Sequence, residues 1–168
     1  LYGIWDKQAS NSAPTLNRAS LQPQTITAQS TSTFSSTTQT VRTVSANSVD
    51  WTTKYGWYLD FAVGTTYLGE RLVDPMNLTP SVLFVSTRTP STDVCTPGIT
   101  GWSYGLDPNT GGATTFSVFN FSRTGTITDA DKLNGGVVSA YATVAGGLAF
   151  MSNSSTNVAG AVNGSNVS

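Results

Sequence analysis

The sequence has no histidine, and this absence removes several classes of function. Histidine is the usual general base and proton shuttle of enzymes, and it is the commonest protein ligand of transition metals. A nucleophilic triad that depends on an imidazole therefore cannot form within the chain. We predict a protein that is not an enzyme and that has no catalytic residues.

Charge, cysteine and long apolar runs are also scarce. Charged residues make up 10% of the chain and the formal net charge is -1, so we expect no nucleic-acid partner. Cys95 is the single cysteine, which excludes an internal disulfide and indicates a buried or idle thiol, with an intermolecular partner as the alternative. No apolar run approaches the roughly 20 residues that span a bilayer, so no membrane span is predicted. The chain opens on "LYGIWD" without methionine or signal peptide, which indicates a processed or excised piece of a larger protein.

Serine and threonine, in contrast, make up more than a quarter of the sequence. Threonine, valine and aromatic residues favour strands, whereas helical segments rich in alanine, glutamate and lysine are missing. Hydrophobic residues amount to 38%, which is enough for a packed core. The composition predicts an all-β fold of antiparallel sheets.

Alternating polar and apolar segments between turn residues predict about ten strands. They span residues 1–6, 23–34, 37–50, 54–61, 69–75, 81–88, 101–112, 114–121, 135–144 and 146–152. The two threonine-rich segments, 23–34 and 37–50, are predicted to form a hairpin. Strand spacings of about 8 to 12 residues are typical of a sandwich, a barrel or a propeller, and the periodicity does not choose among them.

Seven segments resemble the final blades of the C-terminal β-propeller in the PilC/PilY family of type IV pilus assembly and tip-adhesion factors of Gram-negative bacteria. They are "LYGIWD", "QTITAQ", "RTVSANSVDW", "KYGWYLDF", "GERLVDP", "VLFVSTRTPSTDVCTPG" and "GWSYGLDPNTGG". The resemblance implies a partial β-propeller of two to three blades over residues 1–152, followed by a Ser/Asn-rich tail at 153–168. It also implies a location outside the cell, on the pilus or the outer membrane.

A propeller of four to eight blades cannot close from so few strands, so we expect open sheet edges that another chain or copy completes. The partners that the resemblance implies are other pilus or propeller segments, copies of this chain, and a host or surface receptor whose binding residues the sequence does not identify.

The aromatic residues Trp57, Trp102 and Tyr104 are predicted to fill the space between sheets. Glu70 and Arg71 follow a turn, and we expect them to pair at the surface with Asp74 or Lys54, a contact of about 0–1 kcal/mol. Asp107 and Asn109 are expected to cap the turn that follows residue 106 through hydrogen bonds from side chain to backbone.

The segment "NFSRTGTITDAD", residues 120–131, has the spacing of a calcium loop. In PilC/PilY relatives the corresponding loop resembles Asp-x-Asn-x-Asp-Gly with a further Asp at position 9. Those ligand positions fall here on Asn120, Ser122, Thr124 and Thr128, none of which is a carboxylate, and Asp131 is the acid left at position 12. We predict a degenerate loop that keeps its turn through Gly125 and Ile127 but holds no metal, and no cofactor is expected. Asp129 and Asp131 are better explained as a helical first turn capped by Thr128.

Three hypotheses for function follow. The first is a non-enzymatic cell-surface protein of the type IV pilus system, acting in pilus biogenesis, tip adhesion or motility. The second is a structural subunit of an extracellular filament that assembles by β-strand augmentation. The third is enzymatic, because Tyr104 to Gly111 also resembles a blade motif of quinoprotein dehydrogenases, but such a turn recurs without any cofactor site.

Overall fold

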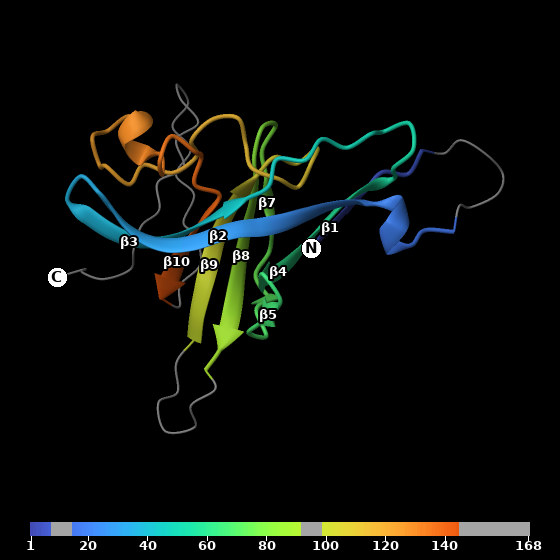
Figure 1. Cartoon of the computed structure of the whole chain (residues 1–168), viewed down its shortest axis with the longest axis horizontal. Coiled ribbons are helices and arrows are strands. Elements are labelled where there is room, and N and C mark those ends of the chain that lie inside the picture. Colours follow the sequence, from blue (N-terminus) through green and yellow to red (C-terminus); the bar gives the residue numbers. More distant parts are fainter. Residues whose placement is uncertain (8–14, 92–98, 145–168) are drawn as a thin grey trace.

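The computed structural model of the chain describes residues 1–7, 15–91 and 99–144. In these residues ten strands form a single curled sheet, with two short 3₁₀ helices at Arg18–Ser20 and Asp129–Asp131 (Figure 1). The predicted all-β class is confirmed. Cys95, the predicted strand at 146–152 and the predicted tail at 153–168 lie outside the described residues.

The sheet consists of two groups of four strands. The first, in spatial order, contains β1 (Tyr2–Ile4), β4 (Gly56–Val63), β2 (Gln22–Phe34) and β3 (Thr37–Val44). The second contains β10 (Ala140–Val144), β9 (Ile99–Leu106), β8 (Leu83–Pro90) and β6 (Arg71–Leu72). Two short strands lie off this path, with β5 (Thr66–Tyr67) on β4 and β7 (Asn77–Leu78) on β8. Four strands are the usual content of one propeller blade. The two groups are nevertheless continuous, because β3 pairs with β10.

The predicted threonine-rich hairpin is ordered and consists of β2 and β3. Figure 1 shows this long hairpin running across the molecule, with β8 and β9 descending steeply from it. Its exposed face carries cross-strand pairs of threonine hydroxyls, such as Thr27 with Thr43 and Thr31 with Thr40, both 2.8 Å apart. Because such pairs stabilise antiparallel strands, a threonine-rich sequence is compatible with order.

The pairing of β2 with β4 is parallel, whereas the sequence predicted antiparallel sheets. The chain reaches β4 after the β2–β3 hairpin and a loop that crosses back through Val49 and Trp51. This crossover reverses the direction expected from consecutive hairpins.

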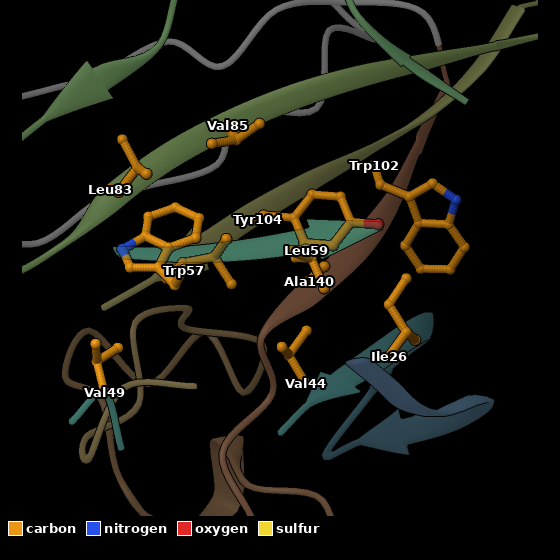
Figure 2. Close-up of a cluster of buried hydrophobic side chains, with 11 residues drawn as sticks. Ile26, Val44, Val49, Trp57, Leu59, Leu83, Val85, Trp102, Tyr104 and Ala140 are labelled. Carbon is orange, nitrogen blue, oxygen red and sulfur yellow. The ribbon is translucent and has the colours of Figure 1, made fainter. Parts of the chain in front are cut away.

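The concave face of the sheet encloses the larger core. The two strand groups face each other here and contribute the buried side chains Ile26, Val44, Val49, Trp57, Leu59, Leu83, Val85, Trp102, Tyr104, Leu106 and Ala140. In Figure 2, Tyr104 and Leu59 lie between Trp57 at one end and Trp102 at the other. The predicted space-filling role of these aromatic residues is confirmed by their burial.

A second core covers the opposite face of β3, β10, β9 and β8. It contains Val118, Phe119 and Phe121, which lie in a segment predicted as a strand at 114–121. This prediction was wrong, because residues 114–121 form no strand and pack on the sheet through their side chains, just after a bridge between Leu106 and Ala113. Gly105 permits this approach, since a methyl group there would lie 2.9 Å from a methyl of Val118.

Candidate functional site

The segment 120–131 closes on itself through hydrogen bonds among its own polar side chains. The Ser122 hydroxyl donates to Asn120 Oδ1 at 3.3 Å and lies 3.0 Å from the Thr124 hydroxyl. Asn120 Oδ1 also accepts from the Arg123 backbone N–H at 2.8 Å. The turn that follows uses Gly125 with φ +83°, a conformation that glycine adopts without steric cost. Asn120, Ser122 and Thr124, three of the four positions carried over from the family's calcium loop, are therefore neighbours in space.

Asp131, at the last loop position, is buried and fully engaged with backbone groups. One carboxylate oxygen accepts from the Ser122 N–H at 2.7 Å and the other accepts from the Thr128 N–H at 2.8 Å. Burial disfavours the charged form, but these backbone hydrogen bonds outweigh it and hold the pKa of Asp131 below its usual range. Thr128 caps the 3₁₀ helix Asp129–Asp131, as predicted.

The oxygen atoms of this loop do not fit Ca²⁺. Calcium affinity in such loops is set largely by the number of carboxylate ligands. Of the two carboxylates in this loop, Asp131 accepts amide hydrogens at both of its oxygens, and Asp129 pairs with Lys132 at 2.8 Å. The remaining candidates, Asn120, Ser122 and Thr124, are neutral and bond to one another. Within the described ranges no group of three or more histidine, cysteine, aspartate or glutamate side chains is placed to hold a metal.

A second polar cluster lies at the concave face and was missed by the sequence analysis. Arg42 and Glu70 form an ion pair of 2.6 Å with side chains that are 2% and 1% exposed. The Tyr104 hydroxyl donates to Glu70 at 2.8 Å and accepts from Arg42. Thr87 donates to Glu70 at 2.6 Å, Gln29 accepts from Arg42 at 2.8 Å, and the guanidinium lies 3.7 Å above the Trp102 ring. Every charged atom of the pair is thus hydrogen-bonded or stacked.

The predicted surface pairing of Glu70 with Lys54, and of Arg71 with Asp74, is wrong. Glu70 turns inward to Arg42, Lys54 donates to the Ala19 carbonyl, and Asp74 pairs with Arg88 at 3.0 Å. The cause is the pairing of β6 with β8, which places the chain before β6 over the concave face. One signal was present in the sequence, because Arg42 shares its strand face with the apolar Val44.

Tyr104 is the titratable residue most altered by this cluster. Burial raises the pKa of its phenol well above the usual value, and the neighbouring Glu70 carboxylate adds to the effect. The group therefore stays protonated and acts as a fixed hydrogen-bond donor. The Glu70 carboxylate is paired with Arg42 and accepts from Thr87 and Tyr104, so the cluster anchors the chain before β6 to the sheet.

The turn after β9 is capped by the Asp107 side chain, as predicted. Asp107 accepts from the Asn109 N–H at 2.8 Å through its side chain and from the Gly111 N–H at 2.7 Å through its carbonyl. Trp57 donates its indole N–H to the Pro108 carbonyl at 3.1 Å, which attaches the turn to β4. No helix in the described ranges is both long and apolar enough to cross a bilayer.

The chain is similar in sequence and in structure to known proteins. No protein-family model matches the chain. The type IV pilus biogenesis factor PilY1 of Pseudomonas aeruginosa strain PAO1 is 46% identical over 137 residues, which cover 76% of this chain and 12% of that protein. PilY1 of strain UCBPP-PA14 is 39% identical over 91% of this chain and 15% of its own length. A PilY1 homolog of Xylella fastidiosa strain Temecula1 is 37% identical over 67% of this chain and 7% of its own length.

The crystal structure of the P. aeruginosa PilY1 C-terminal domain superimposes with a TM-score of 0.80 at 38% sequence identity. The match covers 92% of this chain and 33% of that domain. The chain thus spans at most about a seventh of the curated relatives it matches, and about a third of the solved domain.

Proposed function

The chain belongs to the PilY1 family of type IV pilus biogenesis factors, and from this premise we propose that it is a non-enzymatic part of a pilus biogenesis and tip-adhesion protein at the bacterial surface. The observation that carries this proposal is the structural match over nearly the whole chain at an identity that supports homology. The buried polar groups agree with it, because Arg42, Glu70 and Tyr104 bond to one another and the Glu70 carboxylate is already paired with a cation.

The proposal is tested by exchanging segments between relatives. The matched segment of P. aeruginosa PilY1 is replaced by this chain in the chromosomal gene, and surface pili and twitching motility are measured. We expect pili and motility to be retained, because the backbone of the two segments coincides. A strain in which the segment is deleted serves as the negative control. A chimera that is exported and stable but assembles no pili would contradict the proposal.

We also propose that the open sheet edge beside β6 and β7 docks against neighbouring segments of a longer domain, with a second copy of the chain as the alternative. Among the described residues β1 pairs only with β4 and β6 only with β8. Exposed apolar side chains gather along the second edge, with Val73 59% exposed, Met76 52% and Leu78 68%. Unpaired backbone beside exposed apolar side chains is suited to strand addition.

The segment 120–131 is proposed to act as a metal-free turn. Its hydrogen bonds hold the fold of the loop without an ion, so that calcium has no part in regulating this region. The turn residues Gly125 and Ile127 keep their role in this proposal.

A further inference from the structure

A pocket of about 620 Å³ lies beside β1, at the end of the concave core. This volume falls within the range of small-molecule sites, about 300–1,000 Å³. The pocket is separate from both polar clusters described above. It is lined by Gly3, Ile4, Trp5, Trp51, Trp57, Pro108 and Asn109.

Three tryptophan rings give the pocket flat apolar walls. Trp5 is 49% exposed and its ring meets that of Trp51 edge-on, with centroids 5.5 Å apart and an interplanar angle of 81°. Trp57 is buried and fixed, because Gly3 and Gly111 lie directly against its indole ring and its N–H binds the Pro108 carbonyl. The exposed Trp5 ring thus lies beside a rigid base that the buried Trp57 provides.

The lining carries no ionisable side chain. The nearest cation, Lys7, donates to the Trp51 carbonyl at 2.6 Å, and its ammonium lies 5.4 Å from the Trp5 centroid and 4.5 Å from that of Tyr55. The Lys7 ammonium is already held by the Trp51 carbonyl and the two rings, and no lining side chain offers a charged partner to an ionic ligand. The lining itself thus suits an uncharged ligand.

Polar groups at the rim complement the rings. Leu1 and Leu59 exchange both backbone hydrogen bonds and the Trp5 N–H binds the Tyr55 carbonyl, so the odd-numbered residues of this segment face β4. By the alternation of an antiparallel ladder, the N–H and C=O of Ile4 point away from β4. The Asn109 side chain is exposed beside them. The pocket therefore combines aromatic faces with neutral donors and acceptors.

We propose that this pocket binds a neutral carbohydrate, with one pyranose ring stacked on Trp5 and its hydroxyls bonded to Asn109 and the Ile4 backbone. A sugar ring has an apolar face of C–H groups, which suits the tryptophan rings, and a rim of hydroxyls, which suits the polar groups at the edge of the pocket. Occupation by an extended peptide paired with β1 is the competing outcome. The inference goes beyond the pilus role, since a variant without sugar binding can still assemble pili.

The test uses the 168-residue chain and three neutral sugars: maltose, cellobiose and N,N′-diacetylchitobiose. Binding is followed by tryptophan fluorescence and by calorimetry. We expect at least one sugar to bind, and Trp5→Ala and Asn109→Ala each to weaken it by about tenfold or more. Tyr67→Ala, which removes an aromatic ring that is 70% exposed on β5, is the matched control and should leave binding unchanged.

Fold integrity of each variant is checked by its thermal midpoint, and Asn109→Ala provides a second variant if Trp5→Ala is unstable. The proposal is overturned if none of the sugars binds at concentrations on the order of 10 mM. Equal affinity of Trp5→Ala, Asn109→Ala and the unmodified chain would also overturn it. Fluorescence quenching by an alternating Thr/Val peptide, with no response to sugars, would instead assign the pocket to strand docking.

Discussion

The stability of the buried Arg42–Glu70 ion pair depends on the hydrogen bonds that surround it. Both side chains are almost fully removed from water, and desolvation of two charges is compensated only when geometry and hydrogen bonding are complete. Tyr104, Thr87, Gln29 and the Trp102 ring complete the network around them. The residues of the cluster come from four separate strands and one loop, so its loss would affect the whole concave core.

Glu70→Gln is expected to lower the free energy of unfolding by about 3–5 kcal/mol, because it leaves the Arg42 charge buried without a counterion. Urea denaturation monitored by tryptophan fluorescence measures the change. Asp60→Asn is the matched control, since it removes the same charge from the exposed pair with Arg18, 2.5 Å apart. The control should lose far less of its free energy of unfolding. Equal losses in the two variants would show that burial does not increase the destabilisation caused by breaking the ion pair.

The raised pKa of Tyr104 predicts that the folded chain loses stability at alkaline pH. Its pKa is higher in the folded chain than in the unfolded chain, so the folded state keeps the proton at pH values where the unfolded state releases it. The stabilisation is complete below the ordinary pKa of about 10 and is lost as the pH rises toward the folded value.

Urea denaturation between about pH 8 and 11 should therefore give a falling unfolding free energy, and Tyr104→Phe should make the decline shallower. A smaller decline should remain, because burial also raises the pKa of Tyr141. Tyr67→Phe, at an exposed position, is the control. An unchanged slope in Tyr104→Phe would argue against the phenol as its source.

The loop 120–131 is held in shape by hydrogen bonds among its own residues. Neighbouring side chains at positions 1, 3 and 5 bond to one another, and Asp131 ties both ends of the loop to backbone amides. The sequence was sufficient to predict the capped turn at Thr128, because capping depends on residues three positions apart. It could not predict the hydrogen bonds that close the loop, since these depend on the folded path.

Calcium is expected to leave the thermal midpoint of the chain unchanged, because a ligand stabilises a protein only by binding its folded state. The variant Asn120→Asp, Ser122→Asn, Thr124→Asp is the positive control and should gain a calcium-dependent increase. Calorimetry on both proteins completes the measurement. A micromolar dissociation constant in the unmodified chain would refute the proposal of a metal-free loop.

The two four-stranded groups share the larger core on the concave face, and their outer edges remain open within the described residues. Alternation along the chain was enough to predict the class and most strands, because a strand's own residues determine which face is buried. The parallel contact of β2 with β4 and the inward turn of Glu70 were beyond prediction, since both depend on which distant segments meet. The segment 114–121 was misassigned because alternating apolar residues also suit an unpaired segment packed on a sheet.

The open edge beside β6 and β7 predicts concentration-dependent association of the chain. Light scattering over a concentration series should show a mass that rises above that of the monomer. Leu78→Lys should reduce this rise, because charge on an exposed edge opposes strand pairing. Ala28→Lys adds the same charge to the exposed β2 strand away from that edge and should have little effect. A constant monomer mass at all concentrations would count against docking through this edge.

The pairing of β3 with β10 has a consequence for how the protein folds. It is the one contact in the strand order that joins the two groups, and it pairs Val41 with Tyr141, 100 residues later. Contacts so distant in sequence raise the contact order and slow folding, because the entropy of closing a long loop is lost before the contact forms. During synthesis, the first group has its own strands by residue 63, but β3 has no partner on its second edge until β10 emerges. Completion of the described sheet therefore waits for its last described strand, and until then that edge of β3 stays unpaired.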